Sequence, residues 1–435
     1  MNKMESAAVA ANSKNRLVPT PPMGWNSWDC YGASVNEEEV IGNANYVAEH
    51  LKSYGWEYIV VDAQWYEPTA NCSIFHPFVP LEMDEYSRLI PAVNRFPSAA
   101  DGRGFRSLAD RIHAMGLKFG IHILRGIPRQ AVHSNTPILG SSKGAREIAH
   151  TYSICNWITD MYGIQSQKEG AQAYYNSIFQ LYAEWEIDYV KVDDISHPYS
   201  KGEIELIRGA IDRCGRDIVL SLSPGPAPLQ LAEHLKEQAN LWRVSADFWD
   251  DWKYLYKSFE YSSQWIQYGG PGSWPDLDML PLGHLAIRSK DDGVGERMTR
   301  FTRDEQRTMV SLWCLCQSPL IFGGELRSND EWTLSLLTNR EVLAMHRNGH
   351  SIRELYREQD RVVWMSRGQS DEVYLGFFNI GDDEQNVAVE LYSIDLFGTY
   401  KVTDLWTGEQ HDPASALLQF AVVPHGVRLV RLDSI

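Results

Sequence analysis

The sequence predicts an α/β protein in which a (β/α)8 TIM barrel is followed by a small antiparallel β-sandwich domain. From about residue 17 to 350, short apolar runs rich in β-branched residues alternate with longer stretches of helical periodicity, a pattern typical of parallel βαβ units. Beyond residue 350 the helical periodicity stops, and alternating segments separated by Gly, Asp and Pro turns take over. We therefore expect a barrel domain at 17–350 and a β-domain at 351–435.

Eight segments have the composition of buried strands, and eight parallel strands close such a barrel. The first helix between them is expected to begin with a capping box at Ser34 and Glu37 and to end before Gly55. Segments 66–95 and 124–168 are long for connections from strand to helix, and in a barrel such loops surround the active site. The predicted strands are 23–28, 58–65, 118–123, 189–194, 218–223, 242–248, 274–280 and 318–323.

Charge and composition restrict the class of partner. The formal net charge of −17 disfavours nucleic acid and anionic membranes, so a neutral ligand fits better, and 15 Trp residues hint at sugar binding. No apolar run is long enough for a membrane helix, and the first twenty residues lack the features of a secretion signal. We expect a cytoplasmic protein or a trimmed secreted form, and the frequency of oligomers among soluble enzymes leaves a homo-oligomer open.

The spacing of the cysteines and the absence of common catalytic motifs disfavour several classes of enzyme. Six irregularly spaced cysteines form neither a CxxC pair nor a Cys/His cluster, which favours free thiols and no metal site. The sequence contains no GxGxxG opening a helix, no GxxxxGK[ST], no HExxH and no GxSxG. Nucleotide cofactors, zinc proteolysis and serine hydrolysis are therefore poorly supported.

Acidic residues end four of the predicted strands. Helix capping explains any single one of them, but four acids at one face of a barrel are hard to explain as caps. Glycoside hydrolysis needs two carboxyl groups facing one glycosidic bond, which fits this arrangement. The acids are Asp62, Asp193 with Asp194, Asp247, and Asp276 with Asp278.

Two of these acids share a strand with a basic residue. Strand periodicity places Lys191 on the same side as Asp193, and Arg243 and Ser245 on the same side as Asp247. A nearby cation favours an ionised carboxylate, whereas a proton donor needs burial or a neighbouring negative charge. The sequence alone leaves open which acid has which environment.

Eight motifs in a fixed order extend the argument from single acids to the whole chain. Together they resemble glycoside hydrolase family 27, the α-galactosidase family, from Pro21 to Leu432. The motifs are PPMGWNSW at 21–28, VDAQW at 61–65, GLKFGI at 116–121, KVD at 191–193, WRVSAD at 242–247, WPDLDML at 274–280, SPLIFGG at 318–324 and PHGV at 424–427.

The resemblance implies a retaining, exo-acting α-galactosidase that binds a carbohydrate substrate and uses no metal or cofactor. It assigns Asp193 as the nucleophile that forms a covalent glycosyl-enzyme, and Asp247 as the acid/base. It also implies a barrel with a C-terminal β-sandwich, in agreement with the periodicity. The residues expected to contact the sugar are Trp28, Asp62, Trp65, His122, Lys191, Ser223, Arg243 and Asp278.

The chain departs from the family pattern at positions that recognise the sugar. Many α-galactosidases carry a second Asp where this chain has Ala63, which we expect to open space near the outer hydroxyls of the sugar. β-L-arabinopyranosidase and isomaltodextranase activities therefore remain alternatives, and a non-catalytic carbohydrate-binding protein is an alternative of another class. The other departures are Gln64-Trp65 for Cys-Trp, His122 for Tyr, and Ser223-Pro224 for Glu-Trp.

Overall fold

The computed structural model describes residues 14–289 and 294–435, and its largest sheet contains eight parallel strands. All eight predicted strands occur, several of them shorter than expected. In sheet order the strands are β10 (Trp274–Asp276), β9 (Leu241–Arg243), β8 (Val219–Leu222), β7 (Tyr189–Asp193), β3 (Lys118–Leu124), β2 (Tyr58–Val61), β1 (Met23–Asn26) and β13 (Leu320–Phe322).

The sheet closes on itself beyond β10. Leu280 forms a parallel bridge with Phe322, the last residue of β13. Its amide N donates to the Ile321 carbonyl at 2.7 Å, and the Gly323 amide N donates to the Leu280 carbonyl at 3.0 Å. The predicted barrel is therefore confirmed, and the carboxyl ends of all eight strands meet at one face.

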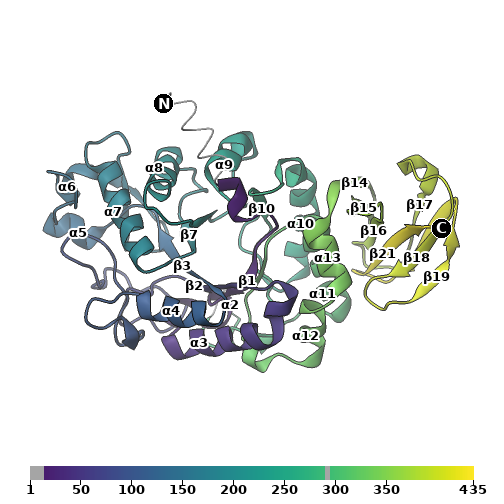
Figure 1. Ribbon diagram of the computed structural model, residues 1–435, viewed down its shortest axis with the longest axis horizontal. Helices are drawn as coiled ribbons and strands as arrows, with labels where there is room; N and C mark the ends of the chain where they lie inside the picture. Colours follow the sequence, from purple (N-terminus) through teal and green to yellow (C-terminus); the bar gives the residue numbers. More distant parts are fainter. Residues whose placement is uncertain (1–13, 290–293) are drawn as a thin grey trace.

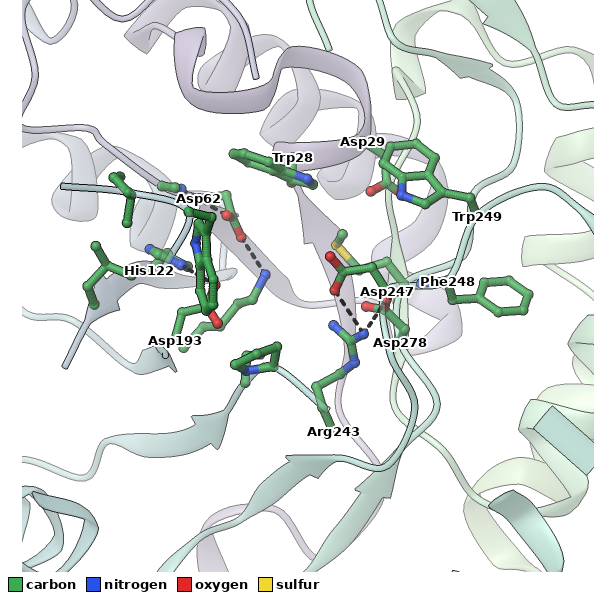
Figure 2. A pocket seen from close by; sticks show the side chains of 18 of the residues that line it. Trp28, Asp29, Asp62, His122, Asp193, Arg243, Asp247, Phe248, Trp249 and Asp278 are labelled. Carbon is green, nitrogen blue, oxygen red and sulfur yellow. Dashed lines mark hydrogen bonds and ion pairs between the residues drawn. The ribbon is translucent and has the colours of Figure 1, made fainter. Parts of the chain in front are cut away.

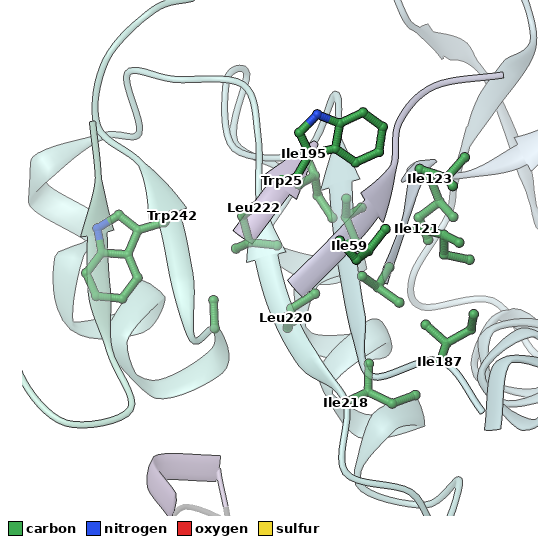
Figure 3. Close-up of a cluster of buried hydrophobic side chains, with 14 of the residues drawn as sticks. Trp25, Ile59, Ile121, Ile123, Ile187, Ile195, Ile218, Leu220, Leu222 and Trp242 are labelled. Atoms are coloured by element: carbon green, nitrogen blue, oxygen red, sulfur yellow. The ribbon is translucent and has the colours of Figure 1, made fainter. Parts of the chain in front are cut away.

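Helices surround the barrel (Figure 1), and apolar side chains fill the space between them and the strands. Figure 3 shows part of this core, in which Trp25, Ile59, Leu220 and Trp242 are almost completely buried. The helices are α3 (Glu37–Tyr46), α4 (Arg106–Ala114), α7 (Ala171–Glu184), α8 (Lys201–Ile211), α9 (Ala232–Gln238), α10 (Trp252–Trp265), α11 (Arg303–Leu315), α12 (Glu331–Leu337) and α13 (Arg340–Asn348).

The prediction of a capping box at Ser34 and Glu37 was wrong by two residues. The residues that form it are Asn36 and Glu39, whose side chains each accept a hydrogen bond from the other's backbone N–H. Ser34 instead ends a preceding 3-10 turn, and its hydroxyl donates to the Tyr31 carbonyl at 2.7 Å. Three consecutive glutamates from Glu37 gave more than one residue the required spacing, and Asn is a strong N-cap.

The long segment 124–168 is more ordered than a loop. It contains α5 (Arg129–Ser134), α6 (Ala145–Ile148) and a three-stranded sheet in the order β4 (Ile127–Pro128), β6 (Met161–Ile164) and β5 (Ala149–Ile154). Residues from this segment line the cavity described below, as a long connection at this face of a barrel predicts.

The C-terminal part is an antiparallel β-domain with two sheets, as predicted. Its larger sheet has the order β14-β15-β16-β21-β18-β19, and β17 pairs with β20 in a second sheet. Apolar side chains from both sheets form a separate core. The strands are β14 (His350–Glu358), β15 (Arg361–Arg367), β16 (Val373–Asn379), β17 (Gln385–Glu390), β18 (Tyr400–Asp404), β19 (Gln410–Ala414), β20 (Leu417–Val422) and β21 (Val427–Ser434).

The β-domain packs directly against the barrel helices (Figure 1). The Thr308 hydroxyl on α11 donates to the His425 carbonyl at 2.7 Å, and the His425 ring stacks on Trp252 of α10 with centroids 3.7 Å apart. The Trp406 indole donates to the Ser311 hydroxyl at 2.9 Å. These contacts join the two domains through polar as well as aromatic groups.

The six cysteines are free thiols, as expected from their spacing. Within 14–289 and 294–435, no helix combines the length and apolarity needed to cross a bilayer.

Close packing of the first two strands gives a test of the fold. A Cβ at Gly24 would overlap the Tyr58 carbonyl oxygen, so Gly24→Ala must push β1 away from β2. We expect a loss of about 1–3 kcal/mol in the free energy of unfolding, measured by chemical denaturation. Gly295→Ala is the control, because a Cβ there meets nothing within 4 Å. Equal stability of the two variants would contradict this account of the strand contact.

Candidate active site

A cavity of about 290 Å³ opens at the carboxyl ends of the barrel strands. This volume is at the small end of the range for ligand pockets, which suits one sugar ring better than a chain. Figure 2 shows the acidic and basic side chains converging on it. Nine of the ten residues predicted from the sequence line the cavity: Trp28, Asp62, His122, Lys191, Asp193, Ser223, Arg243, Asp247 and Asp278.

Trp65, the tenth predicted residue, does not line the cavity. Its side chain is completely buried and packs edge-on against Phe105 and Trp185. Its indole N–H donates to the His122 carbonyl at 2.7 Å. Strand β2 ends at Val61, so the alternation expected over 58–65 does not continue to this residue. Trp65 therefore supports the strand that carries His122 rather than contacting a ligand.

The first charged group in the cavity lies between β2, β3 and β7. Lys191 Nζ donates to Asp62 Oδ2 at 2.8 Å, and the Asn26 amide donates to the same oxygen at 2.7 Å. Burial raises the pKa of Asp62, but the charges of Lys191 and His122 outweigh this and hold it well below its ordinary value. Lys191 and Asp193 both line the cavity, as strand alternation predicts, but the ammonium group of Lys191 forms its ion pair with Asp62.

Asp193 has a different partner, His122. His122 Nε2 lies 3.1 Å from Asp193 Oδ2, and the Asp194 backbone N–H donates to Asp193 Oδ1 at 2.9 Å. Burial raises the pKa of Asp193, but the hydrogen bond and charge of His122 and the charge of Lys191 lower it below its ordinary value overall. Asp193 is therefore held as a carboxylate while its side chain remains 20% exposed to the cavity.

The second charged group is formed by Arg243, Asp247 and Asp278. Arg243 Nη2 lies 2.7 Å from Asp278 Oδ2 and 3.3 Å from Asp247 Oδ1. Burial, together with the charges of Asp247 and Asp276, outweighs the charge of Arg243 and raises the pKa of Asp278 to about 7. In Figure 2 this group and the His122–Asp193 group lie on two sides of the cavity, with Trp28 above both.

Asp247 is the most exposed acid of the two groups, with 73% of its side chain accessible. Strand β9 ends at Arg243, so Asp247 lies in the following loop, and strand alternation does not account for its contact with Arg243. Ser245, which was expected to face the same side, donates to the Leu277 carbonyl at 3.2 Å and does not line the cavity.

Three non-glycine residues just after barrel strands have left-handed backbone conformations. Their φ angles are +59° at Gln64, +55° at Asp194 and +90° at Asp278. Such conformations cost about 1–3 kcal/mol each, concentrate at functional sites and persist only where their surroundings fix them. At Gln64 the side chain donates to Asp160 at 2.9 Å, and Arg95 donates to its carbonyl at 2.7 Å. The chain beside the acids is therefore held in place by specific contacts.

The sequence analysis missed the aromatic residues that complete the cavity wall. Trp157 comes from the segment between β5 and β6, Trp249 from the β9–α10 loop, and Phe75 stacks on Trp28 with centroids 5.9 Å apart. Irregular loops carry no periodic signal, so only the position of Trp249 two residues after Asp247 could have drawn attention to it. Ala63 and Met279 add apolar surface to the cavity.

The arrangement offers carboxylates of contrasting exposure, two ion pairs and flat aromatic surfaces around a space for one ring. The described residues contain no group of three His, Cys, Asp or Glu side chains placed to hold a metal ion. Polar atoms on the wall that have no hydrogen-bond partner among the described residues include the Ser223 hydroxyl, His122 Nδ1 and Arg243 Nε. Such a site can bind a sugar and attack its anomeric carbon.

Comparisons with known proteins agree with this chemistry. The family model for alpha galactosidase A matches residues 20–169 and 164–348, and the model for the alpha galactosidase C-terminal beta sandwich domain matches residues 358–432. Alpha-galactosidase 2 of Arabidopsis thaliana is 26% identical over 425 residues, which cover 96% of this chain and 90% of the relative.

Two solved structures are more similar to this chain than the plant α-galactosidase is. A family 27 β-L-arabinopyranosidase from Geobacillus stearothermophilus is 60% identical, with a TM-score of 0.96 over 97% of this chain and 98% of that chain. An aspartate-to-alanine variant of that enzyme, in complex with arabinose, matches with the same identity and TM-score over 97% and 99% of the two chains. The chain belongs to glycoside hydrolase family 27, the α-galactosidase family, and is a glycosidase.

Proposed function

We propose that this protein is a retaining, exo-acting glycosidase that removes terminal β-L-arabinopyranosyl residues in preference to α-galactosyl residues. Two facts support this choice of sugar: the apolar residue Ala63 on the cavity wall, and the 60% identity to a β-L-arabinopyranosidase. The small cavity supports exo action, because it suits a single terminal ring. α-Galactosidase is the second candidate, since curated α-galactosidases align with almost the whole chain.

In the proposed mechanism Asp193 is the nucleophile and Asp247 the acid/base. The Asp193 carboxylate attacks the anomeric carbon while the Asp247 carboxylic acid donates its proton to the leaving glycosidic oxygen, which gives an alcohol and a glycosyl ester on Asp193. Water then attacks the anomeric carbon, the Asp247 carboxylate takes its proton, and the Asp193 carboxylate leaves. Two inversions retain the anomeric configuration.

The remaining polar residues would bind the ring hydroxyls. Lys191, Asp62 and Ser223 offer donors and acceptors, the Arg243–Asp278 pair offers more on the other side, and Trp28 offers a ring face. Lys191 and Asp62 lie side by side. A sugar hydroxyl that reaches both can accept a hydrogen bond from the Lys191 ammonium and donate one to the Asp62 carboxylate. Such a fixed pattern selects the configuration of the hydroxyl groups.

The observation that carries the choice of sugar is Ala63. β-L-Arabinopyranose has the same ring-hydroxyl configuration as α-D-galactopyranose but lacks the hydroxymethyl group on C5. The Ala63 side chain is an almost completely buried methyl group, so it gives the O6 hydroxyl of a galactoside no hydrogen-bond partner. An unsatisfied buried hydroxyl costs about 1–3 kcal/mol, which corresponds to a preference of roughly tenfold or more for the pentoside.

The first experiment measures 4-nitrophenol release from the β-L-arabinopyranoside, α-D-galactoside, α-D-glucoside and N-acetyl-α-D-galactosaminide. We expect the arabinopyranoside to have the highest kcat/KM, and Asp193→Asn to lower it at least about a thousandfold because the nucleophile is lost. Asp188→Asn is the control, since Asp188 precedes β7 at its other end and pairs with His113 and Arg216. An active Asp193→Asn enzyme would refute the mechanism, and a leading α-galactoside would favour the second candidate.

Ala63→Asp tests the choice of sugar separately. A carboxylate at this position supplies an acceptor for O6, so the ratio of α-galactoside to β-L-arabinopyranoside kcat/KM should rise about tenfold or more. Ala63→Val adds volume without an acceptor, and it should leave this ratio unchanged or lower it. An unchanged ratio in Ala63→Asp would show that residue 63 does not contact the C5 substituent.

The contact between His122 and Asp193 predicts a change in pH dependence. The nucleophile must be ionised, so the acidic limb of kcat/KM follows the pKa of Asp193, which the His122 hydrogen bond lowers. His122→Phe removes that hydrogen bond, the pKa rises, and the acidic limb should move to higher pH. His50→Phe, a change at a surface histidine, should leave the limb in place. An unmoved limb in His122→Phe would contradict the assigned contact.

A further inference from the structure

A buried ionic cluster lies behind Asp193 and outside the cavity. It consists of Arg125, Asp194, Glu203 and Tyr175, each with at most 4% of its surface exposed. Arg125 Nη2 lies 3.0 Å from Asp194 Oδ2, and Arg125 Nη1 lies 3.0 Å from Glu203 Oε1. The Tyr175 hydroxyl donates to Glu203 Oε2 at 2.6 Å. We call these four residues the Arg125 cluster; none of them lines the sugar cavity.

The cluster is connected to Asp193 through the backbone. The Arg125 amide N donates to the Asp193 carbonyl at 3.0 Å, and Arg125 Nε donates to the Asp194 carbonyl. The Asp194 amide N in turn donates to Asp193 Oδ1 at 2.9 Å. Arg125 thus holds both peptide carbonyls next to the nucleophile, as well as the Asp194 side chain.

Asp194 adopts a left-handed conformation with φ of +55°, which costs most L-residues free energy and which Asp adopts where local hydrogen bonds support it. This conformation accompanies the hydrogen bond from its N–H to the Asp193 carboxylate. The Arg125 guanidinium binds the Asp194 carbonyl and carboxylate at once, and Glu203 and Tyr175 fix the guanidinium from the far side. A planar guanidinium can make these divergent contacts, whereas an ammonium group cannot reproduce them.

We infer that Arg125 is a positioning residue for the nucleophile: through Asp194 it fixes the orientation of the Asp193 carboxylate toward the anomeric carbon. This inference rests on the proposed role of Asp193. Attack requires the reacting atoms to be aligned, and a displacement of about 1 Å can cost about a hundredfold in rate. Because the cluster is outside the cavity, it affects the chemical step rather than sugar binding.

The first test is Arg125→Lys, which keeps the positive charge but loses the forked contacts. We expect kcat for the 4-nitrophenyl glycoside to fall about 10- to 100-fold, with KM changed less than about threefold. Arg208→Lys is the matched control, because Arg208 is a largely buried arginine of α8 that pairs with Asp212, the residue after the helix, away from the cavity. Unchanged kcat in a folded Arg125→Lys enzyme would overturn the inference.

A second test separates positioning from a general effect on the fold. In Asp193→Gly, added azide replaces the carboxylate: the azide anion attacks the anomeric carbon, 4-nitrophenolate leaves, and a glycosyl azide forms. Azide is not attached to the chain, so Arg125→Lys should change the azide-dependent rate less than about twofold in this background. An equal loss in both backgrounds would show that Arg125 supports only the fold. Full activity of Asp193→Gly without azide would instead refute the proposed nucleophile.

If Arg125→Lys does not fold, Asp194→Asn answers the same question. This substitution keeps the shape of the side chain and the backbone N–H that donates to Asp193, but it removes the charge that pairs with Arg125. We expect the same pattern, a lower kcat with little change in KM and no further loss in the azide-dependent reaction. A kcat equal to that of the unmodified enzyme would overturn the inference.

Discussion

Hydrogen bonding between eight parallel strands, closed into a barrel through Leu280 and β13, is the constraint on which the site depends. In an open sheet β10 and β13 would be opposite edges, so Asp278 after β10 and Trp28 after β1 would lie far apart. Closure brings both to the same cavity as Asp193 at the end of β7. Because the strands are parallel, every loop that follows a strand reaches this one face.

Bringing charged groups together in a partly buried cavity requires that they be paired, since an isolated buried charge is strongly unfavourable. Lys191 pairs with Asp62, and Arg243 pairs with Asp278. The acidic groups on the wall still outnumber these two cations. The excess favours positive charge in the cavity, as an oxocarbenium-like transition state requires. The pairings that offset the cost of burying these charges therefore also leave the site with the net negative charge that glycoside cleavage needs.

The sequence by itself determined the architecture and nearly all of the cavity-lining acids and bases. Parallel strands that end in Asp must place those residues at one face, so strand periodicity and strand order were sufficient to bring Asp62, Asp193 with Asp194, Asp247, and Asp276 with Asp278 to that face. The resemblance to family 27 added Trp28, His122, Ser223 and the choice between the acids. Ala63 was recognised as unusual because a single residue type differed from a strong pattern.

Only the tertiary structure decided which groups pair and which face away. Lys191 pairs with Asp62, which lies on another strand and which strand alternation cannot assign as its partner. Trp65 is buried because β2 ends at Val61 and the chain then turns. Trp157 and Trp249 lie on irregular loops, whose paths depend on distant contacts rather than on local periodicity. The Arg125 cluster joins residues far apart in the chain, so its existence follows from packing and from no pattern of spacing.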